Sequence, residues 1–301
     1  MRLPEAFQST MNFKGWAIPG QSLKDQVRAQ GDGAFGSVGK TSGGEDYTID
    51  ALCGLFGIAQ LKNGHRFSTD DLLVAWYGQA GCARPARILD LGSGIGTIAQ
   101  ILAWKNPGVP VVSIEAQSTS VELAKVARVR NGLEDRWTIL EGDFRESRVR
   151  EGLGEFDLIC GSPPYFPVGT GELSEHPQKQ ACRFELRGDV ADYARVAAQH
   201  LAPAGVFACV FPNAQKERAD QGIREAGLTV LKTRAVQLKE GDDPLLRVYL
   251  AVKSTDFPPE AVAEAGAALW SEPDLMIRTK DGRVSREYRT IKFFLGFPAN
   301  G

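Results

Sequence analysis

Along much of the chain, short runs of apolar residues alternate with stretches in which apolar residues recur every three or four positions. The apolar runs of strand length lie at 87–91, 111–115, 138–141, 156–160 and 206–211. The helical patterns between them lie at 97–105, 118–131, 146–151 and 190–201. Strands that alternate with helices are typical of a parallel sheet covered by crossover helices.

Two further β-rich runs, at 228–238 and 246–252, follow a predicted helix at 213–226 and flank the turn-rich sequence 240–244. Such a pair predicts an antiparallel hairpin that closes one edge of the sheet. The pattern as a whole predicts an α/β fold with a mostly parallel, seven-stranded sheet, an antiparallel edge hairpin and helices on both faces.

The first 46 residues lack sustained periodicity, and six glycines fall between positions 31 and 44. Glycine-rich sequence without periodicity is typical of a linker. We therefore predict a flexible tail over 1–46 and one folded domain over 47–297.

The composition is that of an ordinary globular protein, with 37 acidic residues against 35 lysines and arginines. The five cysteines are widely spaced and form no CxxC pair, which is typical of reduced thiols in a cytosol-like compartment. No apolar run is long enough for a membrane span, and His65 and His176 lack partners at metal-ligand spacing. We expect a cytoplasmic protein without a metal, although the basic first 30 residues leave an organelle transit peptide open.

The most specific local motif is a glycine loop between the predicted strand at 87–91 and the predicted helix at 97–105. It contains Asp90, Gly92, Gly94 and Gly96. Glycines let the backbone approach a ligand closely, and the helix N-terminus offers free N–H groups to an anionic group. Glu115 ends the next strand, 25 residues after Asp90, where a carboxylate can accept hydrogen bonds from both ribose hydroxyls. The loop therefore predicts a nucleoside-cofactor site.

A second candidate site, Ser162-Pro163-Pro164-Tyr165, follows the strand at 156–160. The carboxyl ends of parallel strands form one ligand crevice, so this tetrapeptide is expected beside the glycine loop. The Ser162 side-chain oxygen and the Pro163 carbonyl can accept the two N–H bonds of an exocyclic amine and localise its lone pair. Tyr165 can stack on an extruded planar base. These residue types predict a site that binds the exocyclic amine of a planar base.

An acidic strand end followed by Gly-x-Gly-x-Gly resembles motif I of the class I S-adenosylmethionine-dependent methyltransferases. The dinucleotide fingerprint differs, because Thr97 stands in the place of its third glycine. The resemblance implies a Rossmann-like fold and S-adenosylmethionine as cofactor. It also implies that Asp143, with Phe144 beside it, binds the adenine amino group. A helix N-cap is the alternative for Asp143.

The tetrapeptide resembles motif IV of the amino-methyltransferases that act on adenine N6, cytosine N4 or glutamine N5, with Ser162 where many members carry Asn. Three further segments, 61–73, 176–183 and 275–295, resemble the bacterial tRNA adenine-N6 methyltransferases that modify position 37 of valine tRNA. This resemblance covers about 48–297. It implies that Thr69 and Asp70 cover the methionine end of the cofactor and that tRNA is the substrate.

The positions of the basic residues add support for an RNA substrate. The segment 276–294 holds six lysines and arginines against two acids, Tyr288 lies among them, and Arg286 and Arg289 are candidate RNA contacts. A solvated helix face would carry the same charges. Beside the tetrapeptide, Phe166 and Arg183 are candidate contacts to the flipped base and its backbone.

Three alternatives stay open at this point. They are glutamine-N5 methylation of a protein, guanine-N2 methylation of rRNA, and a catalytically silent RNA-binding module. The expected oligomeric state is a monomer or a weak dimer.

Overall fold

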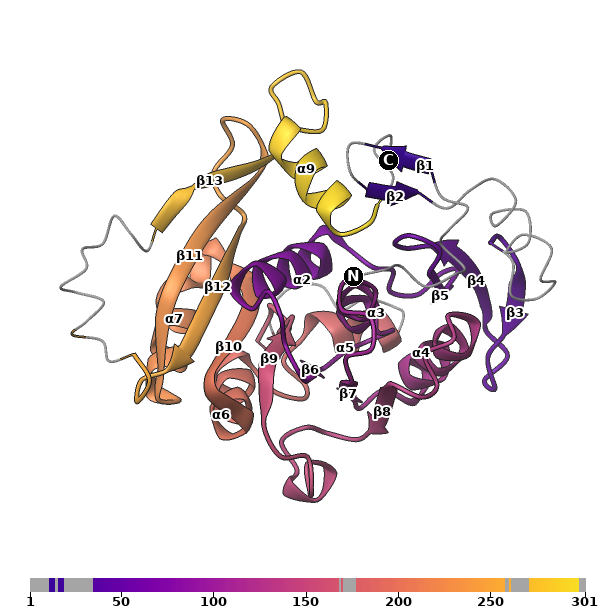
Figure 1. Ribbon diagram of the computed structural model, residues 1–301, viewed down its shortest axis with the longest axis horizontal. Coiled ribbons are helices and arrows are strands. Elements are labelled where there is room, and N and C mark those ends of the chain that lie inside the picture. The colour runs from indigo at the N-terminus through magenta and orange to yellow at the C-terminus, as the bar shows by residue number, and fades with distance from the viewer. Residues whose placement is uncertain are drawn as a thin grey trace.

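The computed structural model describes residues 11–13, 16–18, 35–167, 169, 177–257, 260 and 271–297. Most of the predicted tail and His176 lie outside the described residues. An eight-stranded sheet forms the centre of the molecule, in the order β13-β11-β12-β10-β9-β6-β7-β8 (Figure 1). Within the described ranges, no helix is both long and apolar enough to cross a membrane.

Five neighbouring strands of this sheet are parallel, as predicted. They are β6 (Ile88–Leu91), β7 (Val111–Glu115), β8 (Trp137–Glu141), β9 (Phe156–Gly161) and β10 (Leu201–Pro212). The chain runs from β6 outward to β7 and β8, and then returns to β9 on the other side of β6. The loops after β6 and β9 therefore leave the sheet at the point where the strand order reverses, the usual ligand crevice of such sheets.

The predicted hairpin is confirmed, because β11 (Leu228–Lys239) and β12 (Leu246–Lys253) pair in antiparallel register. It does not close the edge, since β13 (Ser271–Arg278) adds beside β11 in parallel and makes eight strands rather than seven. Leu275 and Ile277 are buried on one face of β13, whereas Pro273 lacks the N–H that a central strand donates. Both features are typical of an edge strand.

Helices cover both faces of the sheet. One face carries α2 (Thr69–Gly81), α3 (Thr97–Lys105), α4 (Ser118–Arg130) and α9 (Arg286–Phe294). The other carries α6 (Val190–His200) and α7 (Lys216–Glu225). The predicted helix at 146–151 is only a 3-10 turn, η3 (Ser147–Val149). A second 3-10 turn, η4 (Asn213–Gln215), precedes α7, and α5 (Pro177–Arg183) lies between β9 and α6.

A separate antiparallel sheet consists of β3 (Val38–Lys40), β4 (Asp46–Ala51) and β5 (Gly57–Leu61). Its buried strand β5 packs against α4, and Asn131 holds Gly57 through bonds of 2.9 Å to both its N–H and its carbonyl. The small sheet therefore includes β3 at residues 38–40, which precede the predicted domain start at 47. Two shorter strands, β1 (Met11–Phe13) and β2 (Trp16–Ile18), pair with each other.

Candidate functional site

A cavity of about 690 Å³ opens at the carboxyl edge of the parallel strands. Its walls come from the loops after β6, β7, β8 and β9, the start of α2 and the segment that joins α5 to α6. Pockets for small molecules and cofactors commonly have this size and place in α/β folds. The structure thus brings the glycine loop and the Ser-Pro-Pro-Tyr loop to one cavity, as predicted.

The glycine loop faces this cavity through Gly94. Its φ is +54°, and no heavy atom lies within 4 Å of the point where a Cβ would stand. Its neighbours are glycines for another reason, since a Cβ at Gly92 would lie 2.0 Å from the Tyr193 hydroxyl and one at Gly96 2.4 Å from the Trp137 ring. Gly94 therefore leaves room for a ligand in the cavity, Gly92 leaves room for Tyr193, which also lines the cavity, and Gly96 leaves room for Trp137 behind the loop.

Glu115 holds the loop from the end of β7. Its carboxylate accepts hydrogen bonds from the backbone N–H groups of Gly94 and Gln117, both at 2.7 Å. The side chain is only 6% exposed, and burial raises its pKa. The carboxylate nevertheless lines the cavity, so it remains within reach of a bound group.

Asp90 lies behind the loop rather than in the cavity wall. It is fully buried, and its Oδ2 accepts a bond of 3.1 Å from the Ala99 N–H, in the first turns of α3. Its Oδ1 has no hydrogen-bond partner among the described residues, and burial raises its pKa well above the usual range. The structure therefore places Asp90 as an anchor of the loop, and neither Asp90 nor Gly96 reaches the cavity as a cofactor contact was expected to.

Two carboxylates at the start of α2 face the cavity, and sequence reasoning named only Asp70. Asp71 closes a capping box by accepting a bond of 3.1 Å from the Ser68 N–H, and burial raises its pKa to about 7. An acidic residue in the first turn of a helix is commonly a capping residue. The sequence therefore does not indicate that Asp71 also faces the cavity. Thr69 does not line the cavity. Its hydroxyl lies 3.5 Å from the Tyr288 hydroxyl of α9.

The Ser-Pro-Pro-Tyr loop is fixed from several sides. The N–H groups of Tyr165 and Phe166 both donate to the Arg183 carbonyl, at 3.1 and 3.0 Å. Gln215 donates to the Tyr165 carbonyl at 2.9 Å, and the Tyr165 ring packs edge-on against Phe211. Ser162, Pro163, Pro164, Tyr165 and Phe166 all line the cavity.

The hydroxyl of Tyr165 donates to Oδ2 of Asp70 at 2.5 Å. This bond joins the predicted amine site to the start of α2 across 95 residues of sequence. Burial raises the pKa of both side chains. Asp70, predicted as a contact to the cofactor, is therefore also a partner of the candidate stacking residue.

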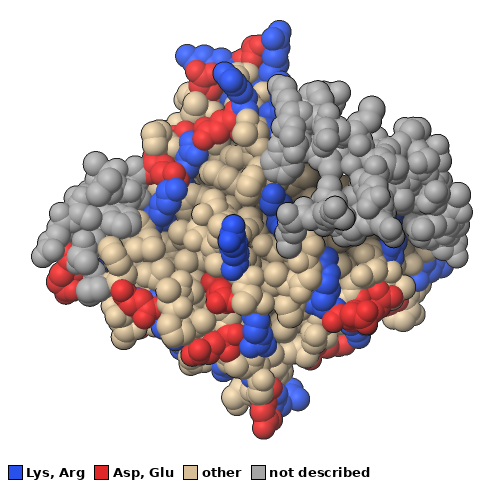
Figure 2. Space-filling view, viewed as in Figure 1, with Lys and Arg blue, Asp and Glu red and all other residues tan. Residues whose placement is uncertain are grey.

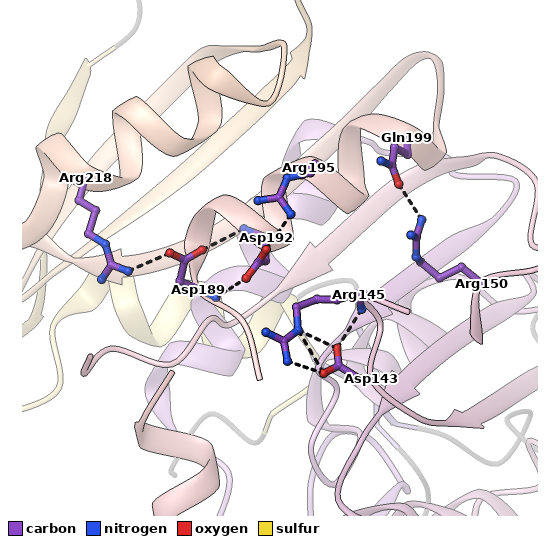
Figure 3. A network of polar contacts seen from close by, with 8 residues as sticks. All are labelled: Asp143, Arg145, Arg150, Asp189, Asp192, Arg195, Gln199 and Arg218. Atoms are coloured by element: carbon purple, nitrogen blue, oxygen red, sulfur yellow. Dashed lines mark hydrogen bonds and ion pairs between the residues drawn. The ribbon is translucent and has the colours of Figure 1, made fainter. Parts of the chain in front are cut away.

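Asp143 and Phe144, which follow β8, also line the cavity. Arg145 donates to Asp143 through its backbone N–H at 2.9 Å and through its guanidinium at 2.6 Å (Figure 3). Burial alone would raise the pKa of Asp143, but the bonds and charge of Arg145 lower it overall. The following 3-10 turn begins after Glu146, so Asp143 is not its N-cap. Phe144 stacks edge-on against Tyr193 at 4.5 Å.

Tyr193 also lines the cavity and was not predicted, because its position in α6 follows the apolar pattern of a core helix.

Arg183 and Arg187 are exposed at the cavity wall beside Phe166, which is 45% exposed. By contrast, Arg286 and Arg289 are exposed on α9, outside the cavity. Figure 2 shows basic side chains, with acids among them, over this part of the molecule. In the part of the chain that the structure describes, no group of three His, Cys, Asp or Glu side chains is placed to hold a metal.

Parts of this chain are similar to known methyltransferases. Residues 46–176 match the model of the family described as Methyltransferase small domain. A tRNA1(Val) (adenine(37)-N6)-methyltransferase of Porphyromonas gingivalis is 31% identical over 52% of this chain, and the alignment spans 62% of that relative. One with the same name from Aeromonas hydrophila is 29% identical over 76% of this chain and 90% of its own length.

The fold itself also has a counterpart among solved structures. The crystal structure of a predicted O-methyltransferase from Agrobacterium tumefaciens superposes with a TM-score of 0.50 at 16% identity, over 76% of this chain and 98% of that one. At this identity the likeness concerns the fold alone. Residues 46–176 of this chain are thus similar to the methyltransferase small domain family, and the sheet order is that of a class I methyltransferase fold.

Proposed function

We propose that this protein transfers a methyl group from S-adenosylmethionine to an exocyclic amino group, and that the acceptor is adenine N6 in tRNA, at a position of the anticodon-loop 37 type. The observation that carries the proposal is the single cavity lined by both Gly94 with Glu115 and the Ser162–Tyr165 loop. A nucleoside cofactor and an amine acceptor would meet there.

The residues of the cavity fit such a cofactor. The space beside Gly94 is open where a Cβ would otherwise project, and the Glu115 carboxylate beside it can accept hydrogen bonds from ribose hydroxyls. Asp143 and Phe144 would bind the adenine, and the Asp70 and Asp71 carboxyl groups in the same cavity suit a cationic ligand. When bound, S-adenosylmethionine supplies an electrophilic methyl group on a sulfonium.

The chain's own residues would prepare the acceptor. The Ser162 hydroxyl oxygen and the Pro163 carbonyl would accept the two amine N–H bonds, so that the nitrogen lone pair turns away from the ring and toward the cofactor. Tyr165 would hold the flipped base by stacking, as aromatic side chains do in enzymes that act on extruded bases. Because the transfer would leave the nitrogen as a positively charged ammonium, which is a strong acid, one of its protons would pass to water without a dedicated base.

The choice of tRNA rests on the names of the relatives, and exposed residues around the cavity support it. Phe166 offers an aromatic surface for a neighbouring base, and Arg183 and Arg187 offer charge for the phosphates. Farther out, Arg286 and Arg289 would track the backbone of the RNA stem.

The deciding experiment uses the purified chain, labelled S-adenosylmethionine and an unmodified valine tRNA transcript. After digestion to nucleosides, the label is expected in N6-methyladenosine. A matched transcript with guanosine in place of adenosine at position 37 should take up no label. Labelling of glutamine in a protein extract but not of the tRNA, or of guanine N2 in rRNA, would replace this proposal by one of the alternatives.

The arginines of α9 give a separate prediction. Replacing Arg286 and Arg289 together by Gln should weaken tRNA binding and make the plot of log Kd against log salt less steep by roughly 1 to 2, because two phosphate contacts are lost. The affinity for S-adenosylhomocysteine should not change. Filter binding at several salt concentrations measures the Kd for tRNA, and calorimetry measures the affinity for S-adenosylhomocysteine.

The matched control replaces Arg84 and Arg224, which are exposed near the amino edge of the sheet, away from the cavity. If the control pair reduced the salt dependence as much as the α9 pair, the RNA would not use α9.

A further inference from the structure

The guanidinium of Arg218, in the first turn of α7, joins three segments beside the cavity. It donates to both oxygens of Glu185, at 2.5 and 2.8 Å, and to Asp189 Oδ2 at 3.0 Å, the bond drawn in Figure 3. It also donates to Gln215 Oε1 at 3.3 Å. The Glu185 side chain is only 10% exposed, so water and salt screen this ion pair less than one on the open surface.

Two of these partners hold the loop after β9. Gln215 donates to the Tyr165 carbonyl, and the Glu185 N–H donates to the Phe166 carbonyl, both at 2.9 Å. The N–H groups of Tyr165 and Phe166 in turn donate to the Arg183 carbonyl, two residues before Glu185. The loop and the segment after α5 are therefore bonded to each other, and Arg218 holds both.

The third partner holds the far end of that segment. Asp189 is the N-cap of α6, where its Oδ1 accepts a bond of 3.0 Å from the Asp192 N–H. Arg218 thus holds the segment 183–189 through Glu185 and again through Asp189. Arg187 lies between these two anchors and lines the cavity.

We infer that Arg218 is a positioning residue that fixes the substrate wall of the cavity, by which we mean Tyr165, Phe166, Arg183 and Arg187. The inference rests on the proposed function, which places the flipped base and the RNA backbone against these side chains. Arg218 does not itself line the cavity, so it acts through its partners. Its planar fork of donors can hold several acceptors in one fixed geometry, which the point charge of a lysine cannot do.

The bond from Arg218 also sets the direction of the Gln215 amide. A guanidinium can only donate and a backbone carbonyl can only accept. The amide oxygen of Gln215 therefore faces Arg218, and its NH2 group faces the Tyr165 carbonyl. Gln215→Glu keeps the size of the side chain and the bond to Arg218, but it places an oxygen against that carbonyl and so should loosen the loop.

The glycine loop is held by a different side chain, since Gly94 donates to Glu115 at 2.7 Å. Loss of Arg218 should therefore separate catalysis from cofactor binding. With labelled S-adenosylmethionine and valine tRNA transcript, kcat of Arg218→Met and of Gln215→Glu should fall roughly 10- to 100-fold, because a small displacement of a positioned group can cost as much. The Kd for S-adenosylhomocysteine, measured by calorimetry, should change less than about twofold. Arg218→Lys should recover only part of the kcat, since it keeps the charge and loses the fork.

Arg87→Met is the matched control. The Arg87 guanidinium also donates to backbone carbonyls, two at 2.9 Å, and lies 4.4 Å from the Phe156 ring centroid, as that of Arg218 lies 5.8 Å from the Phe211 ring centroid. It directly precedes β6, at the opposite edge of the sheet from the cavity. Its loss should lower the midpoint of urea unfolding and leave kcat unchanged.

A double variant separates positioning from stability. Removing Arg218 alone leaves the shielded Glu185 carboxylate without its partner, which is destabilising in itself. Arg218→Met with Glu185→Gln removes that charge, so the midpoint of urea unfolding should return toward that of the unsubstituted protein. Its kcat should stay low, because Gln215 and Asp189 do not regain their donor. Recovery of kcat together with stability would overturn the inference.

Hydrogen–deuterium exchange tests the inference without the reaction. The N–H groups of Tyr165 and Phe166 should exchange at least about 10-fold faster in Arg218→Met and in Gln215→Glu, because the segment that holds them is released. Exchange of the Gly94 N–H should not change, and Arg87→Met should alter none of the three.

Unchanged exchange at Tyr165 and Phe166 overturns the inference. If Arg218→Met does not fold, Gln215→Glu decides alone. Absence of tRNA methylation by the unsubstituted protein, with the expected exchange in the variants, would instead overturn the proposed function.

Discussion

Replacing Gly94 by Leu should lower the affinity for S-adenosylhomocysteine by at least about 100-fold while the protein stays folded. The added side chain meets no atom within 4 Å of its Cβ, so it does not disturb the core but projects into the cavity. The left-handed φ of +54° costs a residue with a Cβ only about 1 to 2 kcal/mol. Calorimetry measures the affinity, and urea unfolding measures the stability.

Gly108→Leu is the matched control. Gly108 also has a left-handed φ, +83°, and open space at its Cβ position, but it lies in the exposed turn after α3 and does not line the cavity. It should show a similar loss of stability and an unchanged affinity. Equal affinities in the two variants would mean that the glycine loop does not hold the cofactor.

The second large effect is expected at Trp137, with a loss of about 3 to 5 kcal/mol in the free energy of unfolding for Trp137→Ala. The side chain is fully buried at the start of β8, donates to Ser113 Oγ at 2.8 Å, and fills the space directly behind Gly96. Removing it opens a cavity beneath the glycine loop, so cofactor affinity should fall as well. Urea unfolding measures the free energy of unfolding, and calorimetry measures the affinity for S-adenosylhomocysteine.

Trp137→Phe separates the ring from the hydrogen bond. It keeps an aromatic ring in the core but leaves Ser113 Oγ without its donor, which should cost about 1 to 3 kcal/mol. A loss below about 1 kcal/mol in Trp137→Ala itself would contradict the role assigned to this side chain.

The parallel half of the sheet could be predicted because strands buried on both faces leave continuous apolar runs. The β3–β5 sheet was missed for the opposite reason, and the edge strand β13 was expected only from the resemblance of 275–295 to a terminal strand and helix of the related methyltransferases. The three residues of β3 have no apolar pattern of their own and are ordered by pairing with β4, and β13 is buried on one face and contains Pro273. Their order comes from tertiary packing, which a local pattern does not contain.

In the candidate site, too, residues within a local motif could be predicted from the sequence, whereas contacts between distant segments could not. Residues that share a local motif, such as Ser162 to Tyr165, could be found together, and the strand order brings them beside Gly94 and Glu115. The burial of Asp90 away from the cavity could not be predicted. An acidic residue at a strand end gives the same sequence pattern whether its side chain faces a ligand or a helix backbone. The bond between Tyr165 and Asp70 joins distant parts of the chain and leaves no local pattern.

The backbone of the loop after β9 is already fixed before the proposed RNA substrate binds. Arg183 and Gln215 fix its backbone in the protein alone, so little conformational entropy remains to be lost there when substrate arrives. The deformation needed to reach the reacting geometry would then fall on the proposed RNA substrate, whose base would leave its stack to enter a preorganised cavity. An RNA loop that already holds its base unstacked should therefore bind more tightly than a paired stem.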